Sequence, residues 1–177
     1  DVDVVFHLAA MANVAACERD PIRANATNIQ GTINVFHAMP EHARGLLTST
    51  CHVYGKPANL PLQEADACTP IGVYANTKLE AEKAANALGR DIVIVRAFHH
   101  TGPGQSTEYA LADWAQQVRL GAQQILVGNL EIRRDYSDIR DVVDGYTIAA
   151  EYGLRGGTYN LCTGKSHSLG RFLQILT

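Results

Sequence analysis

Residues 2–8 read VDVVFHL, an almost unbroken apolar run that is rich in β-branched side chains. A run of this kind is typical of a strand that is buried on both faces of a parallel sheet. Similar runs return at residues 45–50 and 92–95, and helical periodicity occupies residues 21–39 and 73–88 between them. This alternation predicts a β-α-β-α-β order, in which crossover helices join parallel strands and cover both faces of the sheet.

The hydrophobic period weakens after residue 100. The remaining chain predicts helices at residues 111–120, 142–152 and 169–176 and short strands at residues 125–127 and 132–136. We therefore expect an α/β protein in two parts. Residues 1–100 form the later strands of a doubly wound parallel sheet, and residues 101–177 form a smaller, mixed α/β lobe. Ligands of such sheets bind beyond the carboxyl ends of the strands.

Composition excludes several classes of protein. The chain has 177 residues, of which 46% are hydrophobic and 19% are charged, and its formal net charge is −3. No basic excess indicates a nucleic-acid partner, and no apolar run approaches the roughly 18 residues that a membrane span needs. Cys17, Cys51, Cys68 and Cys162 form no CxxC pair and no zinc pattern. Spacing alone leaves disulfides open, but the pattern favours reduced, buried thiols, a cytoplasmic location and no metal site.

Residues 74–78 read YANTK and are the strongest local signal of chemistry. Positions four apart share one face of a helix, so the Tyr74 phenol and the Lys78 ammonium can serve one site. A nearby ammonium lowers a tyrosine pKa from about 10 toward neutral, and a tyrosine tuned in this way can exchange a proton with a substrate oxygen. Thr50, in a hydroxyl cluster that ends a strand, can hydrogen-bond the same oxygen. The alternative is an exposed tyrosine beside a solvated lysine.

Five ordered motifs resemble those of the extended short-chain dehydrogenase/reductases that act on nucleotide sugars, the NAD-dependent epimerase/dehydratase family. They are HLAA at residues 7–10, STCHVYG at 49–55, YANTK at 74–78, HHTGPGQ at 99–105 and GNLEIRRDYSDIRDVV at 128–143. The last two look most like the branch of GDP-4-keto-6-deoxy-D-mannose reductases and GDP-mannose 4,6-dehydratases. The resemblance implies a partial Rossmann-like sheet with a substrate-binding lobe, an NAD or NADP cofactor and a nucleotide-sugar substrate.

The resemblance also implies roles for individual residues. Tyr74 is the expected acid/base, Lys78 is expected to hold the cofactor ribose, and Thr50 is expected to orient the reacting oxygen. The expected cofactor-binding residues are Leu8, Ala9, Ala10, Ala12, Lys78 and Phe98. The expected substrate-binding residues are Cys51, His52, His99, Asn129 and Arg134, with the guanidinium of Arg134 on the diphosphate.

Two further residues, Asn28 and Arg133, indicate a role in the site less specifically. Asn28 matches a family position near the active-site helices, and the alternative is a helix asparagine that caps or packs locally. Arg133, directly before Arg134, is expected to face solvent.

Three departures from the family pattern bear on the reaction. Dehydratases place an acidic residue directly after the catalytic threonine, whereas Cys51 and His52 stand here. Dehydration is therefore disfavoured, although His52 can move a proton, while reduction and epimerisation need only the Tyr, Lys and Thr. The Asn of the family's RPFNH motif is His99, a wider group. The glycine-rich turn that binds dinucleotide phosphates has no counterpart, so we expect part of a longer enzyme.

From the resemblance we expect NAD(P)H-dependent reduction of the C4 ketone of a GDP-4-keto-6-deoxyhexose. Nucleotide-sugar 4-epimerisation and GDP-mannose 4,6-dehydration are the alternative reactions, and a non-catalytic remnant or binding module is the alternative of another class. The resemblance also implies a homodimer through the helices at residues 21–39 and 73–88.

Overall fold

The computed structural model describes residues 1–177 and divides the chain into two compact units. The first unit is Asp1–Ala97 with Asp144–Leu161, and the second is Phe98–Val143 with Cys162–Thr177. Residues 144–161, which the sequence placed in the second part, therefore group with the first. They do so because strand β7 (Thr158–Leu161) pairs with β3 (Ile92–Ala97) in the main sheet.

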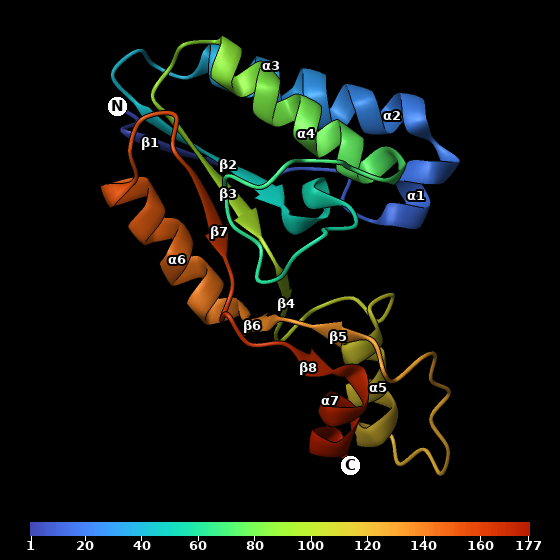
Figure 1. Cartoon of the computed structure of the whole chain (residues 1–177). Coiled ribbons are helices and arrows are strands. Elements are labelled where there is room, and N and C mark those ends of the chain that lie inside the picture. Colours follow the sequence, from blue (N-terminus) through green and yellow to red (C-terminus); the bar gives the residue numbers. More distant parts are fainter. The chain divides into compact units, whose positions relative to one another are not determined.

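The first unit is built on a four-stranded parallel sheet in the order β1-β2-β3-β7 (Figure 1). Strand β1 spans Val4–His7, and strand β2 spans Arg44–Thr50. The helical elements are α1 (Val14–Arg19), α2 (Pro21–Asn25), a π-helical turn (Ala26–Gln30), α3 (Gly31–Ala38), a 3₁₀ turn (Cys51–Tyr54), α4 (Gly72–Ala87) and α6 (Ile139–Tyr152). Helices α3 and α4 lie on one side of the sheet and α6 on the other (Figure 1). The predicted doubly wound α/β fold is confirmed.

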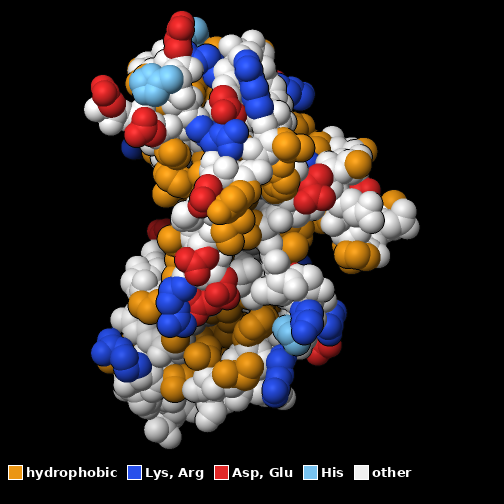
Figure 2. Space-filling view, turned by 90° about the vertical axis from the view of Figure 1, so that its left-hand side faces the viewer, with side chains coloured by type: hydrophobic (Ala, Val, Ile, Leu, Met, Phe, Trp, Pro, Cys, Tyr) orange, Lys and Arg blue, Asp and Glu red, His pale blue; other side chains and the backbone are white.

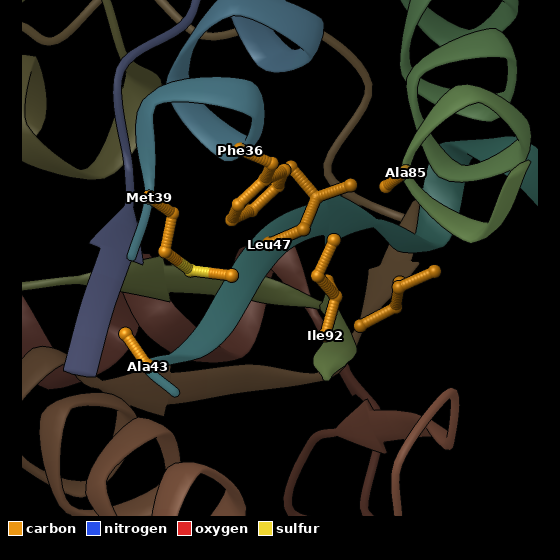
Figure 3. Packing of buried hydrophobic residues seen from close by; sticks show 7 residues of the cluster. Phe36, Met39, Ala43, Leu47, Ala85 and Ile92 are labelled. Atoms are coloured by element: carbon orange, nitrogen blue, oxygen red, sulfur yellow. The ribbon is translucent and has the colours of Figure 1, made fainter. Parts of the chain in front are cut away.

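The main core lies between the sheet and helices α3 and α4. Figure 3 shows Phe36 of α3 beside Leu47 of β2, with Ile92 of β3 and Ala85 of α4 close by. Phe36 has no exposed surface, and Gly45 leaves the space that its ring occupies: a Cβ at Gly45 would come within 2.6 Å of that ring. Close packing of this kind fixes where α3 sits on the sheet.

The first strand is less buried than its sequence predicts. Val5 packs against the core beneath α3, but Val4 and Phe6, which point to the opposite face, are 40% and 43% exposed. Helix α6 covers the far side of the sheet: a Cβ at its Gly145 would come within 2.5 Å of Leu161 of β7, and one at Gly153, directly after the helix, within 3.0 Å of Val93 of β3. It does not cover β1, one of the two edge strands, so hydrophobic side chains remain exposed on that side of the molecule (Figure 2). The expectation of burial on both faces is wrong for β1.

The segment predicted as one helix at residues 21–39 contains an irregular turn. Asp20 caps its start by accepting a hydrogen bond from the backbone N–H of Arg23 at 3.0 Å, and Pro21 occupies the first turn. The π-helical turn Ala26–Gln30 then interrupts the α-helical pattern. Such turns are frequent at functional sites, and this one carries the buried side chain of Asn28.

The second unit contains two small sheets and two helices. Strand β4 (His99–Thr101) pairs in parallel with β6 (Tyr136–Asp138), and β5 (Arg133–Arg134) pairs antiparallel with β8 (His167–Ser168). The helices are α5 (Ala110–Arg119) and α7 (Leu169–Leu176). The predicted strand at residues 125–127 is wrong: this apolar stretch has no strand partner, and Leu126 is 89% exposed.

None of the helices combines the length and the apolar character that crossing a bilayer requires.

None of the four cysteines takes part in a disulfide. Cys17 is buried as expected, whereas Cys162 is exposed, so the expectation of buried thiols does not hold for all four.

Candidate active site

Helix α4 carries the YANTK motif and places three functional side chains along one face. Its first turn is capped from another helix, since the Glu18 carboxylate of α1 accepts a hydrogen bond from the N–H of Val73 at 2.6 Å. Tyr74, Lys78 and Glu82 then follow at intervals of four residues, which puts them on one face of the helix. Tyr74 is half-buried, whereas Lys78 and Glu82 are each only 4% exposed. Charged groups are rarely buried this far without a functional or pairing reason.

The side chain of Lys78 is buried, but its ammonium keeps some contact with solvent and has no acceptor within the chain. It makes no hydrogen bond or ion pair with another residue of the chain. Burial lowers the pKa of Lys78 from 10.5 to about 8, and the negative charge of Glu82 opposes that decrease. Lys78 therefore stays protonated at neutral pH, as a cation with unused hydrogen-bond donors.

The end of strand β2 brings Thr50 and His52 toward Tyr74. Thr50 is buried and caps the 3₁₀ turn, where its hydroxyl accepts a hydrogen bond from the N–H of His52 at 3.3 Å. The His52 ring meets the Tyr74 ring edge-on, with 5.8 Å between centroids. Cys51, between Thr50 and His52, is half-buried. The predicted residues of this segment are thus grouped at the carboxyl end of the strand, where parallel sheets bind ligands.

Asn28 ties the loop after β1 to helix α4. Its amide oxygen accepts from the N–H of Met11 at 2.8 Å, and its amide nitrogen donates to the carbonyl of Met11 at 3.1 Å. The same nitrogen donates to the Thr77 hydroxyl at 2.9 Å, and that hydroxyl donates to the carbonyl of Tyr74 at 2.8 Å. The asparagine bonds across elements rather than locally. It holds the segment around Ala10 and Ala12 beside the turn of α4 that carries Tyr74.

His7 continues this network beneath the site. The Thr32 hydroxyl donates to the carbonyl of Asn28 at 2.7 Å, so the Nε2 of His7, 3.0 Å from the same hydroxyl, acts as the donor to it. Burial, and then the positive charge of Lys78, lower the pKa of His7 from 6.5. The ring is therefore neutral at pH 7, where Lys78 is charged.

The lowered pKa of His7 predicts a loss of stability in acid. Below about pH 6.5 the unfolded chain protonates this imidazole while the folded chain resists doing so, and the unfolded state gains. We expect the free energy of unfolding of the wild type to fall relative to that of His7→Gln between pH 7 and pH 5, as measured by urea unfolding. His37→Gln, an exposed site on α3, serves as the control and should run parallel to the wild type. If the free energies of unfolding of His7→Gln and the wild type changed in parallel between pH 7 and pH 5, the lowered pKa of His7 would be contradicted.

Sequence reasoning missed a buried ion pair at the far end of the same helix face. Glu82 pairs with Arg96, which stands in strand β3 directly after the apolar run IVIV. Two signals were available. Glu82 lies one turn beyond Lys78 on the same face, and an arginine inside a buried strand needs a carboxylate partner.

The second unit holds the remaining predicted site residues. His99 lies in β4 with its ring 5.4 Å from that of Tyr136, which in turn contacts Phe172 at 5.1 Å. Arg134 is exposed in β5, and its guanidinium donates to the carbonyl of Arg133 at 2.8 Å. Arg133 is exposed too, as expected, and it binds Ser166. The unit thus presents two exposed arginines and a group of aromatic rings.

Two more predicted residues occupy loops and strand ends of this unit. The Asn129 side chain accepts a hydrogen bond from the N–H of Glu131 at 2.9 Å within the turn before β5. Phe98 directly precedes β4 and is half-buried. No group of three or more histidine, cysteine or acidic side chains is arranged to hold a metal ion.

The sequence of the chain is similar to a known protein family and to named enzymes. Residues 1–162 match the NAD dependent epimerase/dehydratase family. The GDP-6-deoxy-D-mannose reductase of Pseudomonas aeruginosa is 33% identical over 98% of this chain and 62% of its own length. The UDP-glucose 4-epimerase of Halalkalibacterium halodurans is 28% identical over 98% of this chain and 60% of its own length.

Solved structures show the same likeness. The structure of RMD from Pseudomonas aeruginosa complexed with NADPH matches with a TM-score of 0.90 and 30% identity, over 98% of this chain and 62% of that one. The UDP-N-acetylglucosamine 4-epimerase from Methanobrevibacter ruminantium, in complex with UDP-N-acetylmuramic acid, matches with a TM-score of 0.90 and 28% identity, over 98% and 59%. The chain spans about three fifths of the length of these relatives. The resemblance inferred from the five motifs is confirmed.

Proposed function

Because the chain belongs to the NAD dependent epimerase/dehydratase family, we propose that it carries the catalytic residues of a nucleotide-sugar reductase. The proposed reaction is the reduction of the C4 ketone of a GDP-4-keto-6-deoxyhexose with NADPH or NADH. The observation that carries the proposal is the contact of the Tyr74 ring, on the helix that carries Lys78 one turn later, with the ring of His52, whose N–H is bonded to the Thr50 hydroxyl. The 33% identity to a GDP-6-deoxy-D-mannose reductase supports the choice of substrate.

The residues present fit a nicotinamide cofactor. A buried ammonium with unused donors suits the hydroxyl groups of a ribose, and Lys78 provides one. Leu8, Ala9 and Ala12 are exposed after β1, where small side chains let a ligand approach the backbone. Ala10 is half-buried in the same loop, and Phe98 is the further cofactor contact that we propose. When bound, the nicotinamide supplies the hydride.

The chain's own residues handle the proton. Tyr74 donates its phenolic proton to the oxygen that becomes an alkoxide at C4, and the charged Lys78 stabilises the phenolate that remains. The Thr50 hydroxyl orients the same oxygen. No carboxylate follows Thr50, because Cys51 and His52 stand there, and this favours reduction over dehydration.

The proposal also includes binding of the nucleotide sugar and formation of a homodimer. Arg134 would bind the diphosphate, and Asn129, His99, Cys51 and His52 would line the sugar and nucleotide. The first 100 residues would serve the cofactor and the catalytic step, and residues 101–177 would serve the nucleotide sugar. The proposed homodimer uses the helices at 21–39 and 73–88. Ile22, 84% exposed on the first of these, is the apolar side chain most available for such contact.

Tyr74→Phe provides the test of the reaction. In an enzyme that joins these residues to a glycine-rich phosphate-binding turn, we expect the variant to consume NADPH with GDP-4-keto-6-deoxymannose at least about 100-fold more slowly than the wild type does. The phenyl ring keeps its packing but has no proton to give. Tyr152→Phe is the matched control, because Tyr152 is 71% exposed on α6, and its rate should equal that of the wild type.

The outcomes separate the alternatives. Product formation from a UDP-hexose without net consumption of cofactor would identify an epimerase instead, the activity named for several relatives. Formation of a 4-keto-6-deoxy sugar from GDP-mannose would identify a dehydratase. Calorimetric titration of the 177-residue chain with NADPH and NADH that shows saturable binding would argue against a non-catalytic module, whereas no binding would restrict the proposed reaction to a longer enzyme.

A further inference from the structure

The Glu82 carboxylate is held on both of its oxygens. Arg96 donates from Nε to Oε1 at 3.1 Å and from Nη2 to Oε2 at 2.8 Å, and the Ser49 hydroxyl also donates to Oε1. The side chains of Arg96 and Glu82 are 8% and 5% exposed. A forked, charge-assisted contact of this kind allows the carboxylate little freedom to rotate.

Arg96 is itself held from its other side. Its Nη1 donates to the phenolic oxygen of Tyr54 at 2.9 Å and to the carbonyl of Glu64 at 3.3 Å. The guanidinium also lies over the Tyr54 ring, 4.9 Å from its centroid, and the Tyr54 hydroxyl donates to the side chain of Asn160 at 2.7 Å. The negative charge of Glu82 is therefore fixed by a network of groups from three strands, a 3₁₀ turn and a loop.

Two charged groups lie one helical turn beyond Lys78, the Glu82 carboxylate and the Arg96 guanidinium bonded to it, and of these only the charge of Glu82 shifts the pKa of Lys78. Tyr74 lies one turn before it on the same helix, and His7 faces it from β1 as a neutral ring. Thr77 and Asn28 contribute only uncharged groups from the adjacent turn. Glu82 is the only acidic residue among the buried side chains of the chain.

We propose that Glu82 is a positioning residue of the active site, which holds a fixed negative charge one helical turn beyond Lys78 and so keeps that buried ammonium charged. Arg96 and Ser49 hold the carboxylate in place. The inference deepens the proposed function, because a charged Lys78 is what stabilises the Tyr74 phenolate. Its test reads the lysine directly, so the inference stands or falls without any measurement of turnover.

The test is the titration of Lys78 in the 177-residue chain by NMR with isotope-labelled lysine. The chain has only four lysines, and Lys78→Met identifies the resonance of interest. Removing Glu82 alone would leave Arg96 unpaired, so the variant is Glu82→Met/Arg96→Met, in which both charges give way to side chains of similar volume. We expect Lys78 to bind its proton at least about tenfold more weakly than in the wild type.

A matched control lies on the same helix. Glu80 is exposed and pairs with Lys83 at 2.7 Å, so Glu80→Gln removes the same charge two residues earlier and should leave the Lys78 titration unchanged. If Glu82→Met/Arg96→Met does not fold, Glu82→Gln/Arg96→Gln removes both charges while keeping hydrogen-bonding groups. We expect Lys78 in that variant to bind its proton more weakly by the same factor. An unchanged Lys78 titration in either folded double variant, or an equal shift in Glu80→Gln, would overturn the proposal.

Discussion

Arg96→Met is expected to lower the free energy of unfolding by about 3–5 kcal/mol. The substitution leaves the Glu82 carboxylate buried, with the Ser49 hydroxyl as its one remaining hydrogen-bond donor. A buried carboxylate that has lost the cation bonded to both of its oxygens is among the least favourable groups in a protein interior. The loss also removes the donor to the Tyr54 phenol and the contact with the loop at Glu64. Urea unfolding followed by circular dichroism measures the change.

Two comparisons show whether charge or packing is responsible. Glu82→Met/Arg96→Met should regain most of the lost stability, since replacing a buried ion pair by apolar groups is often close to neutral. Lys83→Met breaks the exposed pair with Glu80 and should cost no more than about 1 kcal/mol. If the double variant were as unstable as Arg96→Met, the loss would be one of packing, and the account of an unpaired carboxylate would be wrong.

Lys78→Met is expected to change stability in the opposite direction. The folded chain holds this ammonium 4% exposed and without a hydrogen-bond acceptor. Its pKa falls from 10.5 to about 8, which corresponds to roughly 3 kcal/mol of unfavourable free energy in the folded state at neutral pH. Methionine has a similar length and no charge. We therefore expect the variant to be about 2–3 kcal/mol more stable than the wild type at pH 7.

The stability difference between Lys78→Met and the wild type should depend on pH. Below pH 8 both the folded and the unfolded wild-type chain carry the Lys78 proton, and the full penalty of burial is present. Between pH 8 and about 10.4 the folded chain releases the proton while the unfolded chain retains it, so the wild type gains stability as pH rises. The advantage of Lys78→Met should therefore shrink through this range. A constant difference from pH 7 to pH 10 would show that another property of methionine causes the effect.

The same substitution should abolish cofactor binding if the proposed function holds. Lys83→Met, exposed on the same helix, should leave both stability and NADPH binding close to those of the wild type. Stabilisation with loss of binding is the behaviour of a residue that is kept for function at the expense of the fold. Destabilisation by Lys78→Met would instead show that the ammonium has a structural partner in the folded chain.

Much of the fold and part of the site could be predicted from residue patterns. The apolar runs around Val5, Leu47 and Ile94 identified three of the four strands, because burial in a parallel sheet needs continuous apolar sequence. Strand β7 was missed, since its sequence TYNL is half-buried and too polar to stand out. The short apolar stretch at residues 125–127 was mistaken for a strand, because nothing in a local pattern shows whether a partner strand exists.

The site divides in the same way. Tyr74 and Lys78 could be placed together from the sequence alone, because a helix brings residues four apart onto one face whatever surrounds it. The partners of Asn28 could not be placed so, since its bonds reach Met11 and Thr77, 17 and 49 residues away. The pairing of Glu82 with Arg96 joins a helix to a strand in the same manner. Local periodicity is a property of the chain, whereas the charge state of Lys78 depends on burial and on groups that only packing brings together.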